Sequence, residues 1–137
     1  MLEPQRAFVL SVQARDANSL TARFTIADGY YLYRGKLKFV LAEGALALPP
    51  DLPPGKTKDD PFFGSVEIYR GTVAVDIKLD RDRGGETVGL VVESQGCADL
   101  GVCYPPQRQT VAVALPRAGT RPGPPVEGAP RKKSWFN

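Results

Sequence analysis

Short segments in which apolar and polar residues alternate recur along most of this chain, and they limit what it can fold into. In residues 19–27, Leu20, Phe24 and Ile26 fall on one face of an extended strand. The same period of two occurs in six further segments, residues 8–12, 37–41, 66–69, 73–79, 88–92 and 111–115. Turn-forming residues separate the segments, and none has a helical period with caps. About seven short strands at such intervals predict an all-β fold, an immunoglobulin-like antiparallel β-sandwich.

Few residues in the chain can carry chemistry. Histidine is absent, which excludes Ser-His and Cys-His nucleophile activation and imidazole metal ligands. One methionine and two cysteines are too few soft ligands for a closed zinc or copper(I) site, so we expect neither a metal nor a cofactor. Acidic pairs such as Asp59 and Asp60 are typical of solvated turns, and Gly84-Gly85 lacks the Lys-Ser/Thr of a phosphate-binding loop. Sulfur is the reactive group that remains.

The only two cysteines, Cys97 and Cys103, are separated by five residues that form a predicted turn between two strands. A disulfide that closes so short a loop contributes about 2–2.5 kcal/mol on the chain-entropy model, less than a long-range staple. The structural disulfide of an immunoglobulin-like sandwich joins the two sheets across many residues, which this pair cannot do. Two interpretations remain: a small clip that rigidifies a hairpin, or an exposed redox pair at the edge of the sandwich.

The composition changes at Pro116. Residues 1–115 are expected to form one domain, and residues 116–137, rich in proline, glycine and basic residues, an extended or disordered linker rather than a packed element. The segment ends in Arg131-Lys132-Lys133 followed by Trp135 and Phe136, which is consistent with the approach to a membrane surface or with a solvated tail.

The net charge argues against nucleic acid as a partner, and the hydropathy argues against a membrane-spanning segment. The net charge is +3, from 18 basic and 15 acidic residues, and much of the excess lies after residue 116. The expected domain is therefore near neutral, and nucleic acid is not expected as a partner. No apolar run approaches the ~20 residues that span a bilayer. The first residues lack the apolar segment of a signal peptide, so we expect a cytosolic chain or the mature piece of an exported one.

Two segments hold unusual aromatic residues. Residues 28–34 place three tyrosines, Tyr30, Tyr31 and Tyr33, after a turn, and residues 60–64 put Phe62 and Phe63 in a loop bounded by proline and glycine. Rings in loops usually fold back and complete the core. The alternative is that these rings cover a group that must be kept from water or from wrong partners.

Three blocks of the chain carry a family resemblance. They are Asp28-Gly29-Tyr30-Tyr31-Leu32-Tyr33-Arg34, then Phe62-Phe63-Gly64 with Glu67-Ile68-Tyr69-Arg70, then Gln95-Gly96-Cys97-Ala98-Asp99 with Gly101 and Cys103-Tyr104-Pro105-Pro106. In order and spacing they resemble the N-terminal periplasmic domain of DsbD, a bacterial inner-membrane thiol–disulfide interchange protein. The resemblance covers roughly residues 5–115. It implies an immunoglobulin-like sandwich, in agreement with the strand pattern.

The resemblance implies roles for individual residues. Cys103 forms the intermolecular mixed disulfide, and Cys97 is its resolving partner. Phe62 is the aromatic residue of a cap loop that lies over the sulfurs and moves aside when a partner docks, and Tyr31 and Tyr33 line the site. The expected site residues are Cys97, Cys103, Tyr31, Tyr33, Asp60, Pro61, Phe62, Phe63 and Gly64. Pro61 departs from the family, which carries an acidic residue there, and predicts a stiffer hinge.

Partners and location are also implied by the resemblance. The segment itself does not span the membrane but is a periplasmic part of an inner-membrane protein that does, with residues 116–137 leading towards a transmembrane region. It takes electrons from the C-terminal thioredoxin-like domain of DsbD. It passes them to DsbC-like and DsbG-like isomerases and to the thioredoxin-like protein of cytochrome c maturation. The expected activity is that of a protein-disulfide reductase; the alternative is a non-catalytic immunoglobulin-like binding module with a structural disulfide.

The residues around the cysteines predict a slow free thiol. The attacking species is the thiolate, which nearby cations favour and nearby carboxylates disfavour. Between Gln95 and Gln107 there is no lysine or arginine, only Asp99. Reaction is therefore expected to need a partner that supplies a more acidic cysteine or changes the environment on docking.

Overall fold

The computed structural model describes residues 1–117, 119 and 121–128. Its elements are α1 (Pro4–Ala7), β1 (Phe8–Asp16), β2 (Ser19–Ile26), β3 (Tyr30–Tyr33), the 3-10 helix η1 (Arg34–Lys36), β4 (Lys38–Leu41), β5 (Lys56–Asp60), β6 (Gly64–Tyr69), β7 (Thr72–Lys78), β8 (Thr87–Ser94), β9 (Gly96–Ala98), β10 (Gln107–Ala114) and β11 (Val126–Glu127). Among the described residues, no helix is long and apolar enough to cross a bilayer. The basic and aromatic residues 131–136 lie outside the described part, so the expectation attached to them is untested.

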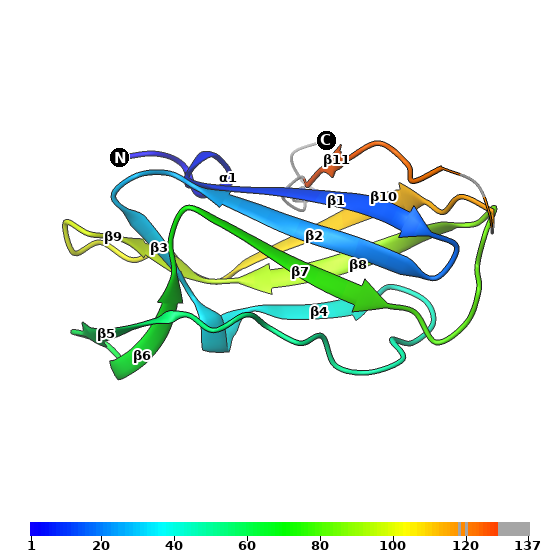
Figure 1. Ribbon diagram of the computed structural model, residues 1–137. Helices are drawn as coiled ribbons and strands as arrows, with labels where there is room; N and C mark the ends of the chain where they lie inside the picture. The colour runs from blue at the N-terminus through cyan, green and yellow to red at the C-terminus, as the bar shows by residue number, and fades with distance from the viewer. Residues whose placement is uncertain (118, 120, 129–137) are drawn as a thin grey trace.

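Two antiparallel sheets form the body of the molecule. One has the order β11-β1-β2-β7 and the other β10-β8-β4, and they lie over one another with the core between them (Figure 1). A third sheet, in the order β5-β6-β3-β9, stands at one end. The predicted antiparallel β-sandwich of immunoglobulin type is confirmed.

The alternating segments form the walls of the core. In β2 the residues predicted for one face, including Leu20, Phe24 and Ile26, are all buried, and β7 alternates between exposed and buried along its length. All seven predicted strands are present, with their ends moved by a few residues. Each large apolar side chain buried in this way contributes roughly 1.5–3 kcal/mol. The largest fully buried side chains are Phe24, Leu10, Leu20, Leu32, Ile77, Leu90, Val12, Val75, Val92, Val111, Val113 and Cys97.

The segment after Pro116 differs from its prediction. Val126–Glu127 forms β11, which pairs antiparallel with Ser11 and Val12 of β1. Main-chain N–H groups of Gly123 and Gly128 donate to the carbonyls of Ala14 and Leu10, at 3.0 and 2.8 Å. The expectation that nothing in this segment packs is therefore wrong for these residues. The reason is that β1 offers an unpaired edge whose main-chain groups bond any extended chain, whatever its side chains.

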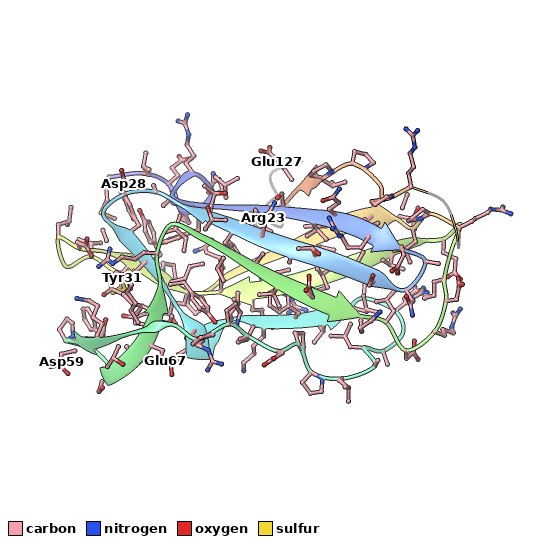
Figure 2. The ribbon with its side chains drawn as sticks, viewed as in Figure 1. Arg23, Asp28, Tyr31, Asp59, Glu67 and Glu127 are labelled. Atoms are coloured by element: carbon pink, nitrogen blue, oxygen red, sulfur yellow. A yellow bond between two sulfur atoms is a disulfide. The ribbon has the colours of Figure 1, made fainter. Side chains whose placement is uncertain are left out.

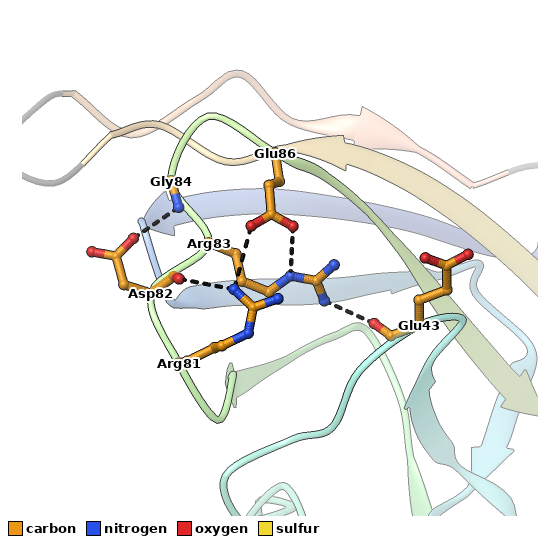
Figure 3. Close-up of polar contacts among 6 residues, drawn as sticks. All are labelled: Glu43, Arg81, Asp82, Arg83, Gly84 and Glu86. Atoms are coloured by element: carbon orange, nitrogen blue, oxygen red, sulfur yellow. Dashed lines mark hydrogen bonds and ion pairs between the residues drawn. The ribbon is translucent and has the colours of Figure 1, made fainter.

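A charged cluster closes the end of the sandwich away from β9. Arg83, 7% exposed, donates to the Glu43 carbonyl (2.7 Å) and to the Glu86 carboxylate (3.1 Å), as Figure 3 shows. Asp82 accepts the N–H of Gly84 at 2.8 Å in the same turn. Arg83 therefore joins the turn before β8 to the loop after β4.

Candidate redox site

The two cysteines form a disulfide at the end of the sandwich that carries the third sheet. Cys97 lies in β9, and Cys103 faces it as an antiparallel partner, with the two Cα atoms 3.9 Å apart. The turn between them is closed by a hydrogen bond from the Ala98 N–H to the Val102 carbonyl, 2.7 Å long. Gly101 in this turn has φ 105°, a left-handed conformation that favours glycine. The five-residue spacing therefore folds as a tight, bridged hairpin.

The two cysteines are unequally exposed. Cys97 is 1% exposed and packs in a small cluster with Tyr31, Tyr33 and Ile68, while Cys103 is partly exposed at the edge of that cluster. An external thiolate therefore reaches the Cys103 sulfur more readily than the Cys97 sulfur, and access decides which sulfur is attacked.

Alternation along β3 explains why its tyrosines divide between two clusters. Tyr30 and Leu32 face the main core, whereas Tyr31 and Tyr33 face the sulfurs. Because β3 pairs with β9, Tyr31 lies opposite Cys97 in the ladder. Figure 2 shows Tyr31 at this end of the sandwich.

Tyr31 and Tyr33 converge on one carboxylate. Both hydroxyls donate to Asp60 Oδ2, at 2.8 and 2.6 Å. The hydroxyl oxygen of Tyr33 also lies 3.0 Å from Cys97 Sγ and 3.7 Å from Cys103 Sγ. A path of polar contacts thus runs from the disulfide through Tyr33 to Asp60.

Asp60 is 4% exposed, so the solvated turn expected for the Asp59-Asp60 pair is wrong for this residue, and it lies against the two tyrosines with which the resemblance grouped it. Burial raises the pKa of its carboxyl, but hydrogen bonds from Tyr33, Tyr31 and the two backbone N–H groups that follow outweigh burial and lower the pKa below its usual value. Burial and the hydrogen bond to Asp60 raise the pKa of both tyrosines. At neutral pH the Tyr33 proton is therefore directed at a charged carboxylate. The Tyr33 oxygen is left to accept from a Cys97 S–H once the disulfide is reduced, which favours the thiol form of Cys97.

Asp60 also shapes the predicted cap loop. Its Oδ1 accepts the N–H of Phe62 at 2.8 Å and that of Phe63 at 3.0 Å, which holds the loop as a compact turn. Gly64 ends the turn at φ 74°. Pro61 has no N–H, and the N–H groups that Asp60 binds belong to the next two residues, so the proline removes no donor that this turn uses.

The ring that contacts the site is that of Phe63. It meets the Tyr33 ring edge to face, with centroids 5.0 Å apart, and Lys36 Nζ lies 5.0 Å from its centroid. Phe62 is 61% exposed. The role of Phe62 over the sulfurs stays a prediction; the ring that the structure packs against a lining tyrosine, Tyr33, is that of its neighbour Phe63.

Cations reach the site from other strands, which the sequence around the cysteines did not reveal. Lys58 Nζ and the Arg70 guanidinium carbon lie 5.3 and 5.4 Å from the centroid of the Tyr31 ring. Arg70 also binds Asp99, with the shorter contact at 2.7 Å. β5 and the residue after β6 thus supply cations beside Tyr31, while the slow free thiol expected at Cys103 stays a prediction.

Residues behind the hairpin were also missed. A Cβ on Gly96 would lie 2.5 Å from the Phe8 ring and 2.5 Å from the Tyr31 carbonyl oxygen, so only glycine fits beside Cys97. Tyr104, next to Cys103, packs edge to face on Phe8 with centroids 5.6 Å apart and donates to the Leu2 carbonyl. The first residues of the chain thus support the cysteine hairpin from behind.

Comparison with known proteins places the chain in a family. The family model for the N-terminal part of the thiol:disulfide interchange protein DsbD matches residues 1–115. The chain belongs to the DsbD N-terminal domain family. DsbD of Ralstonia nicotianae is 40% identical to it over 127 residues, which cover 91% of this chain and 20% of that protein. DsbD 1 of Pseudomonas aeruginosa is 40% identical over 107 residues, 77% of this chain and 18% of that protein. The chain spans about a fifth of the length of these curated relatives.

Solved structures of DsbD N-terminal domains match most of the chain. The reduced form of the Neisseria meningitidis domain is 32% identical, with a TM-score of 0.78, and the match covers 94% of this chain and 96% of that one. A chain from the complex between the DsbD and PilB N-terminal domains of the same organism is 35% identical, with a TM-score of 0.69, covering 82% and 86%.

Proposed function

We propose that this chain is a periplasmic thiol–disulfide exchange domain that cycles between the Cys97–Cys103 disulfide and a dithiol. The supporting observation is the unequal pair, in which Cys97 is buried against Tyr33 and Cys103 is partly exposed. A disulfide that served only as a clip has no need of one reachable sulfur and one enclosed in a polar network. Membership of the DsbD N-terminal family supports the same function.

In the reductive half of the cycle, a thiolate of a donor protein attacks Cys103 Sγ. The Cys97–Cys103 bond breaks, its electron pair goes to Cys97 Sγ, and that sulfur takes up a proton. A mixed disulfide now joins Cys103 to the donor. The second thiolate of the donor attacks the bonded donor sulfur and releases Cys103, so that the donor loses two electrons and this chain gains two.

The oxidative half runs in the opposite direction. The Cys103 thiolate attacks the disulfide of an acceptor, and Cys97, after losing its proton, attacks Cys103 Sγ and releases the reduced acceptor. Tyr33, whose oxygen lies 3.0 Å from Cys97 Sγ, is positioned to bind the proton-bearing form of that thiol. Cys97 therefore acts only within the chain, as the resolving cysteine.

The cap loop, residues 60–64, is proposed to control access to the sulfurs. Phe62 is the shielding ring of this proposal, and Phe63 and Tyr33 form the contact that the loop makes with the site. Asp60 binds both lining tyrosines and both phenylalanine N–H groups, so the loop and the lining share one anchor.

We assign the donor as the C-terminal thioredoxin-like domain of DsbD. The proposed acceptors are DsbC-like and DsbG-like isomerases and the thioredoxin-like protein of cytochrome c maturation. The N. meningitidis complex of DsbD and PilB N-terminal domains supports docking of a thioredoxin-like partner in general. Residues 116–137 are proposed to lead from this domain towards the membrane-spanning part of DsbD.

Trapping of the mixed disulfide tests the proposal. The Cys97→Ser chain is mixed with a thioredoxin-like domain whose single cysteine carries a thionitrobenzoate leaving group. We expect release of thionitrobenzoate and a covalent heterodimer on a non-reducing gel, because Cys103 is reachable. The matched Cys103→Ser chain, which keeps the buried cysteine, should react at least about tenfold more slowly. If Cys97→Ser forms no heterodimer, the transfer function is wrong and the binding module with a structural clip replaces it.

A further inference from the structure

Arg70 touches three parts of the redox site at once. Its two terminal nitrogens donate to the two carboxylate oxygens of Asp99, at 3.0 and 2.7 Å, in a bidentate pair. One of them also donates to the Tyr30 carbonyl at 3.2 Å. The guanidinium carbon lies 5.4 Å from the centroid of the Tyr31 ring. The side chain thus links the end of β6, the start of β3 and the turn after β9.

The turn that Arg70 holds is the one that joins the cysteines. Asp99 is the second residue after Cys97 and the fourth before Cys103, and it is the only charged residue between them. The N–H of Asp99 donates to the Gly29 carbonyl at 2.8 Å, so the main chain is fixed as well. The carboxylate therefore has a defined place in the turn that joins the two cysteines.

Several charged and titratable groups surround Asp99 and the sulfurs. The hydrogen bond from Arg70, together with the charges of Arg70 and Lys58, lowers the pKa of Asp99 below its usual value. Tyr33, 3.0 Å from Cys97 Sγ, links the sulfurs to the charged Asp60. Of these two carboxylates, Asp60 accepts from the tyrosine hydroxyls and Asp99 from an arginine.

We propose that Arg70 is a positioning residue for thiol–disulfide exchange, because it fixes the cysteine turn and neutralises the carboxylate that the turn carries. The proposal rests on the exchange function given above. Each time the disulfide or the mixed disulfide opens, a thiolate forms at Cys103, at the end of the same short turn that carries Asp99. With Arg70 paired to Asp99, that thiolate meets a neutral ion pair; without Arg70 it meets an unpaired negative charge. Arg70 therefore makes thiolate formation at Cys103 easier without touching the sulfur.

The pH dependence of alkylation measures this effect directly. Iodoacetamide reacts with the thiolate of Cys103, which is the only cysteine in the Cys97→Ser chain. In that background, Arg70→Ala is expected to move the midpoint of the rate–pH curve upward by about 0.5 pH unit, since both groups are partly solvated and screened. This shift lowers the rate near neutral pH by about threefold. Arg70→Lys, which keeps the charge, should retain most of the wild-type curve.

A double variant distinguishes an electrostatic effect of Arg70 on Cys103 from a purely structural one. Removing the carboxylate as well, in Arg70→Ala with Asp99→Asn, is expected to return the midpoint to its original value or below it. Asp99→Asn alone should lower the midpoint, a result that stays informative if Arg70→Ala does not fold. Arg81→Ala, in an exposed ion pair with Glu86 at the other end of the sandwich, is the control and should leave the curve unchanged.

The proposal is overturned by an Arg70→Ala curve identical to that of its parent, or by a shift that persists unchanged when Asp99→Asn is added. The same holds for Asp99→Asn alone if its midpoint does not fall. The measurement uses no partner protein, so its outcome is independent of mixed-disulfide trapping, which decides the exchange function itself.

Discussion

Asp60→Asn tests the polar network beneath the sulfurs. Asp60 accepts four hydrogen bonds, from the hydroxyls of Tyr31 and Tyr33 at 2.8 and 2.6 Å and from the N–H groups of Phe62 and Phe63 at 2.8 and 3.0 Å. The amide oxygen of asparagine can keep the two main-chain bonds. The amide NH₂ then faces two hydroxyls that had donated to a charged oxygen. Two charge-assisted bonds are lost and weaker ones form, so we expect the free energy of unfolding to fall by about 2–3 kcal/mol near neutral pH.

The pH dependence of this loss follows from the lowered pKa of Asp60. A carboxyl whose folded pKa lies below its unfolded value stabilises the fold above the unfolded value, about 3.9. This contribution disappears as the pH falls through the lower, folded pKa. The stability difference between wild type and Asp60→Asn should therefore be constant near neutral pH and shrink below about pH 4.

Urea unfolding of the oxidised chain, followed by near-ultraviolet circular dichroism of the tyrosines, measures the difference at about pH 7 and about pH 3. Asp59→Asn is the matched control, because the neighbouring Asp59 is exposed, and it should leave stability unchanged. Equal stability of Asp60→Asn and wild type near pH 7 would refute the reasoning. So would a deficit that is as large near pH 3.

Three further substitutions test other parts of the structure. Phe62→Ala should speed reduction of the disulfide by small thiols severalfold if its ring shields the sulfurs; an unchanged rate in stopped-flow tyrosine fluorescence removes Phe62 from the cap. Gly96→Ala should lose about 1–3 kcal/mol in urea unfolding through overpacking on Phe8, whereas Gly35→Ala, with no atom within 4 Å of its added Cβ, should lose far less. Arg83→Ala should lower the unfolding free energy by about 2 kcal/mol, because the packing of the buried Arg83 side chain and its hydrogen bonds to Glu43 and Glu86 are lost. Its disulfide should be reduced at the wild-type rate, and a changed rate would contradict the separation of the two ends.

The strands of the sandwich could be predicted because each buries one face. Burial of one face makes apolar and polar residues alternate along the strand, and in β2 and β7 this alternation runs along the whole length. In the third sheet only β6 gives such a signal, over residues 66–69. Both faces of β3 are buried, so polar and apolar residues do not alternate along it. β5 is a polar edge strand with the sequence Lys-Thr-Lys-Asp-Asp. β9 has three residues, which is too short for a period to appear.

The reactive atoms of the site could also be predicted, since a chain without histidine and with two cysteines leaves little else. The groups around the sulfurs could not be found in the same way. Asp60 reads as a solvated turn residue next to Asp59, and only the hydroxyls of β3 make its burial tolerable. Arg70 lies 27 positions before Cys97 in the chain, and pairing of β3 with both β6 and β9 brings it to the cysteine turn.

The short pairing of β11 with β1 has a consequence for distance. The chain leaves β10 near the end of the sandwich that carries Arg83, then runs back along β1 from Ala14 to Leu10, about 13 Å at the rise of a strand. Glu127 accordingly lies over the middle of the sheet in Figure 2, not at its far end. A partner tethered through these residues starts that much closer to the sulfurs. With residues 116–137 as the proposed linker, the local concentration of a tethered partner depends on the span that its tether must cover, so the pairing of β11 with β1 would change the frequency of encounter and leave the chemistry at the sulfurs unaltered.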